Sequence, residues 1–78
     1  MTIEIRTRKV VSDVLGVTLE SVTLETAYRD VKQWDSLNVI NMVMALEAEF
    51  AIALEIEDAA RFTSVVAILD VLRERGAT

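Results

Sequence analysis

The sequence predicts an all-α domain: a four-helix bundle with three longer helices, one short helix and a long loop between the first and second helices. Apolar residues recur at helical spacing in three separate segments, which is the pattern of amphipathic helices. The one repeat that alternates like a strand lacks a hairpin turn. At 78 residues the chain has room for a single core, so we expect one domain over residues 1–78.

Residues 2–15 are predicted to form the first helix. Its core stripe consists of Ile3, Thr7, Val10 and Val14, with Val11 at the edge. Gly16 follows directly, and glycine is the usual residue in the left-handed position that follows the last turn of a helix. The first helix is therefore expected to end there.

Residues 17–35 show no sustained helical stripe. The tetrapeptide Val-Thr-Leu-Glu occurs at residues 17–20 and again at 22–25, and this alternation is typical of a hairpin. Only Ser21 links the two copies, however, and no turn sequence such as Asn-Gly is present. We therefore expect a long ordered loop, which in compact domains is often functional. Three side chains are expected to hold it to the core: Val22, Leu24 and Tyr28.

The strongest helical pattern covers residues 36–50 and contains two apolar stripes. With an advance of about 100° per residue, the first stripe consists of Val39, Met42, Val43, Leu46 and Phe50, and we expect it to face the core. The second stripe consists of Leu37, Ile40 and Met44. A helix that is apolar on two sides is either buried all round or presents a binding surface, and so small a domain offers little to bury it.

After Phe50, apolar residues alternate at Ile52, Leu54 and Ile56. A strand here has no partner, so we predict an extended connection and then a short helix over residues 57–62. Thr63 or Ser64 is expected to cap the final helix. The core stripe of that helix consists of Val65, Ile68, Leu69 and Leu72, and Gly76 lies beyond its end.

The composition excludes several classes of function. Cysteine and histidine are both absent, so disulfides, thiolate metal sites and nucleophile–base pairs of the Cys–His or Ser–His kind cannot form. We identify no metal site and no evident acid–base pair, and we predict that the chain is not an enzyme. The formal net charge of −5 argues against binding to nucleic acid, which needs clustered basic residues.

The sequence gives no indication of a membrane protein. No apolar stretch approaches the roughly 18 residues of a membrane span, and charges are interleaved through residues 1–11, unlike a signal peptide. The basic residues Arg6, Arg8 and Lys9 lie together, and a solvated helix face explains them better than a membrane or an acidic partner. We expect a cytoplasmic monomer, and Met1 together with the full bundle favours a discrete protein over a piece of a larger synthase.

Ser36 is the candidate functional residue. It stands within Gln33-Trp34-Asp35-Ser36-Leu37, at the start of the helix with two stripes. The free N–H groups and the positive dipole end of a helix N-terminus favour an anionic group. A serine here is also an ordinary helix cap, so the short motif alone is a weak signal.

A larger set of residues resembles the acyl carrier proteins. The set consists of Asp35-Ser36-Leu37, Val43-Met44-Ala45-Leu46-Glu47, Glu49-Phe50, Thr63 and Val65, with Leu15-Gly16-Val17 and Val22-Thr23 earlier in the chain. The resemblance implies that a phosphopantetheinyl transferase attaches 4′-phosphopantetheine from coenzyme A to Ser36. The arm then carries acyl, aminoacyl or polyketide intermediates as thioesters. Asp35 and Leu37 complete the cofactor motif. By the same resemblance Asp35 helps the transferase position cofactor or metal, and a turn residue or alternative N-cap is its other interpretation.

The resemblance also implies a docking surface for the acyl-, aminoacyl- or ketosynthase-type enzymes that load and unload the arm. Leu37, Ile40 and Met44 match the docking side of the family's second helix, and their alternative role is to seal the domain against the long loop. The acidic residues that we expect to meet basic partner residues are Glu47, Glu49, Glu57 and Asp58. An ordinary solvated face is the other explanation for these carboxylates.

The sequence departs from fatty-acid-synthesis carriers beside the motif, where Gln33-Trp34 and Asn38 replace a Gly-Ala pair and a carboxylate. We therefore expect a carrier of specialised biosynthesis, such as a polyketide or nonribosomal-peptide system. The alternatives are a fatty-acid carrier and an unmodified helical interaction domain. Trp34 either contacts the arm or a partner, or closes the loop over the bundle.

In the family, a space between the second and third helices can shelter the cargo. The residues that correspond to its lining are Met42, Leu46, Ala59, Phe62 and Ile68. Because Phe62 is bulkier than the aliphatic residue usual there, we expect a shallow pocket or none, and a preference for short or polar cargo.

Overall fold

Four α-helices build the fold in the computed structural model, which describes residues 2–78. They are α1 (Ile3–Leu15), α2 (Ser36–Phe50), α3 (Ile56–Ala59) and α4 (Val65–Glu74), with 3₁₀ turns at Leu19–Ser21 and Tyr28–Asp30. Over the described part of the chain there is no β-strand, and one isolated bridge joins Ala27 to Ser64. The predicted all-α fold is therefore confirmed, and the hairpin alternative for residues 17–25 is excluded.

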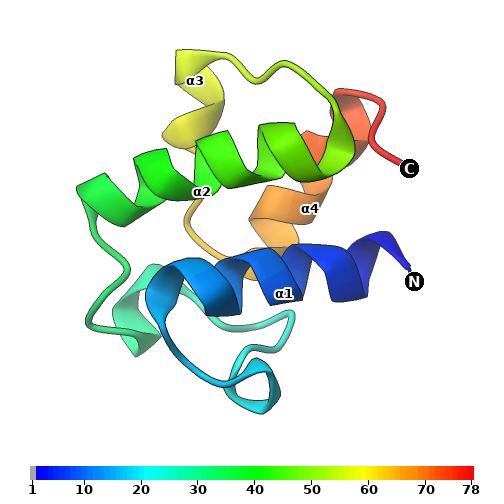
Figure 1. Ribbon diagram of the computed structural model, residues 1–78. Coiled ribbons are helices and arrows are strands. Elements are labelled where there is room, and N and C mark those ends of the chain that lie inside the picture. The colour runs from blue at the N-terminus through cyan, green and yellow to red at the C-terminus, as the bar shows by residue number, and fades with distance from the viewer. Residues whose placement is uncertain (1) are drawn as a thin grey trace.

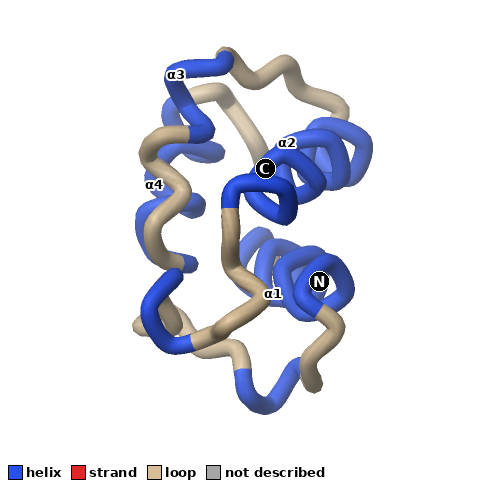
Figure 2. Tube along the Cα trace, turned by 90° about the vertical axis from the view of Figure 1, so that its left-hand side faces the viewer, coloured by secondary structure: helices blue, strands red, loops and turns tan. Residues whose placement is uncertain are grey.

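The helices enclose one core. α1 and α2 lie side by side and run in opposite directions, and α4 lies across them on one side. The short α3 lies next to α2, on the side away from α1 (Figure 1, Figure 2). The completely buried apolar side chains belong to α1, α2, α4 and the first loop: Val11, Val22, Met42, Leu46, Val65, Ile68, Val71 and Leu72. α3 contributes none of these side chains, so it is attached to the bundle rather than part of its centre.

α1 begins and ends as the sequence indicates. The Thr2 hydroxyl accepts a hydrogen bond from the Ile5 N–H at 3.2 Å, and Gly16 follows with a left-handed φ of 70°. The buried face differs from the predicted stripe, because Val11 lies at its centre rather than at its edge. The reason is that α1 contacts both α2 and α4, which widens its buried arc.

Arg6 and Arg8 of α1 bind within the molecule, whereas Lys9 stays on the expected solvated face. Arg6 donates to the Glu49 carboxylate at 2.8 Å and to the Glu49 carbonyl at 2.7 Å, with its guanidinium 4.3 Å from the centre of the Phe50 ring. Arg8 donates to the Val22 carbonyl at 2.6 Å. Lys9 forms an exposed ion pair with Asp13 on the same helix.

The long first loop is ordered by contacts with both neighbouring helices. Val22 is completely buried and Leu24 packs against the core, as predicted. Tyr28 differs, because its side chain is 50% exposed and only its backbone N–H is bonded, to the Thr63 carbonyl at 3.0 Å. Thr26 is the buried residue in its place, and its carbonyl accepts from the Val65 N–H at 3.0 Å. The loop is thereby fastened to the start of α4.

α2 confirms its core stripe. Met42, Leu46 and Phe50 are buried, with Val39 and Val43 packed partly against the core. The helix ends at Phe50, after which Ala51 adopts a left-handed φ of 53°.

α3 is shorter than the predicted helix, since it begins at Ile56 and ends at Ala59 instead of covering residues 57–62. Its start is fixed by the Asp58 carboxylate, which accepts a hydrogen bond from the Glu55 N–H at 2.8 Å. The turn then tightens, because the Arg61 N–H donates to the Asp58 carbonyl and the Phe62 N–H to the Ala59 carbonyl, three residues back in each case.

α4 has the predicted core stripe, since Val65, Ile68, Leu69 and Leu72 are all buried. Ser64 is its cap, and the Ser64 hydroxyl accepts from the Ala67 N–H at 3.1 Å. Among residues 2–78, none of the helices has the length and apolar character needed to cross a membrane.

Candidate functional site

Ser36 is the first residue of α2 and is exposed, but it does not cap the helix. The cap is Asp35, whose carboxylate accepts a hydrogen bond from the Asn38 N–H at 2.9 Å. The Asn38 side chain in turn donates to the Gln33 carbonyl at 2.8 Å. Within the described residues the Ser36 hydroxyl has no hydrogen-bond partner, so the structural role available to a serine here is filled by its neighbour.

The backbone around Ser36 suits an anion. The first N–H groups of an α-helix have no acceptor within the helix, and no other described residue accepts from the N–H of Ser36 or Leu37. They lie at the positive end of the α2 dipole, where a phosphate group is stabilised. The residues present therefore fit a phosphodiester on the Ser36 oxygen.

Trp34 fixes the chain just before the site. Its ring is buried, and its indole Nε1 donates to the Phe62 carbonyl at 3.1 Å. The ring therefore closes the loop over the bundle, which is one of the two roles predicted for it, and it also lines the groove at Ser36. This bond joins the loop before Ser36 to the segment between α3 and α4.

An open groove of about 610 Å³ begins at Ser36. Its lining comes from the first loop, α2 and residues 55–63, which contain α3 and which we call the α3 segment. The lining residues are Tyr28, Trp34, Asp35, Ser36, Val39, Ile40, Ile56, Ala59, Ala60, Phe62 and Thr63. Of the five residues expected around an interior cargo space, Ala59 and Phe62 line this surface groove, whereas Met42, Leu46 and Ile68 are completely buried in the core. A group attached to Ser36 thus meets a groove on the surface.

The second stripe of α2 is exposed. The exposed fractions are 68% for Leu37, 55% for Ile40 and 56% for Met44, so these residues do not seal the domain against the loop. Ile56 at the start of α3 is 85% exposed and lines a second hollow of about 330 Å³ together with Ile40 and Met44. We call Leu37, Ile40, Met44 and Ile56 the exposed apolar surface.

Ile56 was not identified from the sequence as part of this surface. It appeared to continue the alternation of Ile52 and Leu54, both of which are partly buried and packed against the core. Helix α3 starts at Ile56, which ends the alternation and turns the side chain outward. The only available signal was an isoleucine directly before two acidic residues, Glu57 and Asp58.

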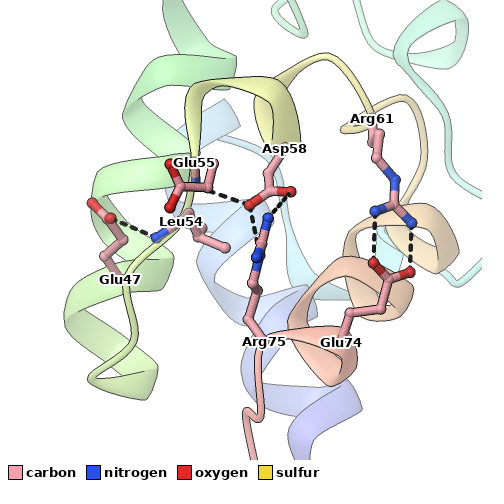
Figure 3. Close-up of polar contacts among 7 residues, drawn as sticks. All are labelled: Glu47, Leu54, Glu55, Asp58, Arg61, Glu74 and Arg75. Carbon is pink, nitrogen blue, oxygen red and sulfur yellow. Dashed lines mark hydrogen bonds and ion pairs between the residues drawn. The ribbon is translucent and has the colours of Figure 1, made fainter.

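The acidic residues that were expected to meet basic residues of a partner differ in whether their carboxylates are free to do so. Glu57 is exposed, while the Glu47 carboxylate accepts from the Leu54 N–H at 2.9 Å and the Glu49 carboxylate pairs with Arg6. Asp58 departs from the expectation for a docking residue, because its side chain is only 4% exposed. Both of its carboxylate oxygens accept from Arg75 at 3.0 Å (Figure 3).

The geometry of Asp58 also shifts its acidity. Hydrogen bonds from Arg75 and from the Glu55 N–H lower the pKa of the Asp58 carboxyl below its ordinary value of 3.8. Asp58 is thus a charged residue that works inside the molecule, and we leave it out of the docking surface.

The chain matches a known protein-family model. The family model described as phosphopantetheine attachment site covers residues 6–72 of the 78 residues. Domains of this family are sites of covalent 4′-phosphopantetheine attachment, and they act as carriers rather than as catalysts. They interact with phosphopantetheinyl transferases and with acyl-processing enzymes in general.

Proposed function

This chain belongs to the phosphopantetheine-attachment family of carrier proteins, and on that premise we propose that Ser36 carries the 4′-phosphopantetheine arm. The observation that supports this assignment most directly is the exposed Ser36 hydroxyl, which no described residue engages, at the positive end of α2. The cap bond of Asp35 at 2.9 Å leaves that hydroxyl free for a transferase.

Each neighbour of Ser36 has a role in this proposal. Asp35 holds the first turn of α2 and offers an acidic group to the transferase. The unpaired N–H groups of Ser36 and Leu37 favour the negative charge of the phosphodiester. The thiol of the arm supplies the thioester chemistry that a chain without cysteine cannot supply. The groove beside Ser36 gives an attached group an apolar surface on which to lie.

The exposed apolar surface is the proposed docking site for the enzymes that load and unload the arm. The centre of a protein interface is typically apolar and its rim polar. Here Glu57 provides an exposed acidic neighbour to Ile56. Leu37, which adjoins Ser36, places this surface directly beside the proposed attachment point.

We further propose that the carrier serves a specialised biosynthesis, such as assembly of polyketide or aminoacyl intermediates. The first part of α2, from Ser36 to Leu46, contains no acidic residue. Because charge complementarity governs partner choice and association rate, a docking helix without charge in its first part favours partners other than those of the acidic fatty-acid-synthesis carriers. Short or polar cargo is expected, since Met42, Leu46 and Ile68 fill the interior.

Intact-mass measurement tests the attachment site. Incubation with coenzyme A and a broad-specificity phosphopantetheinyl transferase is expected to add one phosphopantetheinyl group to the wild type and to Ser21→Ala, and none to Ser36→Ala. Ser21 is a matched control, because it is also exposed and lies outside the groove. An unmodified wild type, or modification that survives in Ser36→Ala, overturns the proposal.

The pathway needs a separate test. Adenylating and acyltransferring enzymes of aminoacyl and polyketide type are to be assayed with holo-protein and compared with a fatty-acid malonyl transferase. Loading by an enzyme of aminoacyl or polyketide type is the expected result. Efficient loading by the malonyl transferase of fatty-acid synthesis, and by none of the others, contradicts the specialised assignment.

A further inference from the structure

Two arginine–carboxylate pairs join the α3 segment to the end of α4. Arg75 donates from Nε and Nη2 to the two carboxylate oxygens of Asp58, each at 3.0 Å. Arg61 donates from Nη1 and Nη2 to Glu74 at 2.8 and 2.7 Å. Figure 3 shows the two pairs side by side. We call these four residues the α3 clamp.

The two pairs have opposite polarity. In one, the α3 segment provides the carboxylate (Asp58), and in the other it provides the arginine (Arg61). If the α3 segment were shifted along α4 so that Arg61 faced Arg75, or Asp58 faced Glu74, two like charges would meet. Bidentate pairs are among the more strongly oriented polar contacts in proteins, so this arrangement defines one register between α3 and α4.

Phe62, three residues beyond the end of α3, is buried and accepts the bond from Trp34, but α3 itself has few other contacts that hold it in place. It is a single turn of four residues, far below the length at which a helix is stable by itself. Its apolar residue Ile56 points outward, and its one buried side chain is the charged Asp58. The connection before it is also held by a carboxylate, through the bond from the Leu54 N–H to Glu47 (Figure 3).

The position of α3 shapes the surfaces next to Ser36. Ile56 and Ala59 line both the groove at Ser36 and the second hollow, while Phe62 lines the groove. A displacement of α3 therefore changes the groove and the exposed apolar surface together. The residues of the clamp themselves line neither.

We propose that Asp58, Arg61, Glu74 and Arg75 are positioning residues. By joining the α3 segment to the end of α4 they keep α3 in its place beside α2, and in this way the end of α4 sets the shape of the docking surface. The part of this inference that concerns docking rests on the proposed carrier function. The part that concerns the position of α3 does not, and the two are tested separately.

Hydrogen exchange of single amides tests the position of α3. The reporters are the N–H groups of Glu55, Arg61 and Phe62, which are bonded within the α3 segment. In Arg61→Glu, where two carboxylates face each other, these amides are expected to exchange about threefold faster, because the pair is roughly half exposed and solvent screens it. Amides in the middle of α1 and α2 are expected to keep their wild-type rates.

Restoring the pair is the decisive variant. Arg61→Glu/Glu74→Arg recreates the pair with reversed polarity and is expected to return the α3 amides toward wild-type exchange. Lys9→Gln removes an exposed ion pair from α1 and is the control that leaves α3 unchanged.

Arg75→Gln is expected to loosen α3 further, because it leaves Asp58 buried without its partner. Wild-type exchange of the α3 amides in both Arg61→Glu and Arg75→Gln overturns the clamp.

Transfer of the arm tests the consequence for docking. With a broad-specificity transferase, Arg61→Glu is expected to raise KM for the carrier severalfold at unchanged kcat, and the double variant to restore it. A wild type that accepts no arm refutes the proposed function and leaves the exchange result standing. Loosened α3 amides with an unchanged KM refute the docking role of the clamp alone.

Discussion

The indole Nε1 of Trp34 donates a hydrogen bond of 3.1 Å to the backbone carbonyl oxygen of Phe62. This contact joins two segments that are 28 residues apart and that both line the groove at Ser36. Since both partners lie in the buried part of the molecule, neither can turn to water instead. The bond therefore holds the end of the first loop against the segment after α3, at one part of the groove lining.

Replacing Trp34 by Phe is expected to destabilise the protein. The variant leaves the Phe62 carbonyl without its donor, and an unsatisfied buried polar group costs about 1–3 kcal/mol. The free energy of unfolding is to be measured by urea denaturation followed by far-UV circular dichroism. Tyr28→Phe serves as the control, because the exposed Tyr28 hydroxyl has no hydrogen-bond partner among residues 2–78. Equal stability of both variants contradicts the role given to the indole N–H.

The two stripes of α2 predict opposite outcomes for two methionines on the same helix. Met42 is completely buried, while Met44 is 56% exposed. Met42→Ala is expected to lower the free energy of unfolding by about 2–5 kcal/mol through lost burial and a cavity. Met44→Ala is expected to change it by less than about 0.5 kcal/mol. Urea denaturation measures both changes. A comparable loss of stability in Met44→Ala shows that the second stripe is packed against the domain and is not an exposed surface.

The sequence predicted these two stripes because a regular helix assigns each residue a direction. Met42 and Met44 are separated by about 200° around α2, so the pattern alone distinguishes a core residue from a surface residue. The same reasoning gave the cores of α2 and α4. It was less accurate for α1, where two packing partners bury a wider arc than one apolar stripe indicates.

Features that depend on distant residues were not predictable in this way. Asp58 and Arg75 are 17 residues apart, and an acidic residue on a short helix reads as a solvated or docking residue until its partner is known. The prediction that Tyr28 is buried was wrong for a related reason. An aromatic residue in a loop with several apolar residues suggests burial, yet the 3₁₀ turn directs the Tyr28 ring outward. For Ser36, the sequence located the start of the helix, but only the cap bond of Asp35 showed that the serine hydroxyl is unoccupied.

Acid is expected to weaken the attachment of α3. Hydrogen bonds from Arg75 lower the pKa of Asp58 from 3.8, and those from Arg61 lower the pKa of Glu74 from 4.5. A carboxyl whose pKa is lower in the folded state stabilises the fold fully above its unfolded pKa. That stabilisation disappears as the pH falls through the folded pKa. The urea midpoint is therefore expected to fall as the pH is lowered from about 5 to about 2.

Asp58→Asn is the variant that assigns this acid dependence. It removes the charge with little change of shape, so it is expected to lower the midpoint at neutral pH and to flatten the fall in acid. Asp13→Asn, at an exposed pair on α1, is expected to follow the wild type. A curve for Asp58→Asn that runs parallel to the wild type at every pH shows that Asp58 does not provide the effect.

Long acyl cargo is expected to leave the thermal stability nearly unchanged. Met42, Leu46 and Ile68 fill the interior, so an acyl chain on the arm at Ser36 finds only the surface groove. A group that binds the folded state strongly raises the melting temperature. Differential scanning calorimetry of the apo, acetyl and dodecanoyl forms checks this. A rise of several degrees in the dodecanoyl form alone indicates that the core opens to admit the chain.

The exposed apolar surface predicts variants that lose docking without losing stability. Ile40→Asp and Ile56→Asp place a charge where each side chain is more than half exposed, so the free energy of unfolding is expected to change by less than about 0.5 kcal/mol. Burying an unpaired carboxylate under a partner enzyme is costly, and the KM for transfer of the arm is expected to rise at least about tenfold. The matched control is Val66→Asp, because Val66 is an exposed apolar residue that lines neither the groove at Ser36 nor the second hollow. If the KM of the transferase is the same for Ile56→Asp as for Val66→Asp, while it is raised for Ile40→Asp, then the docking surface belongs to α2 alone and Ile56 is not part of it.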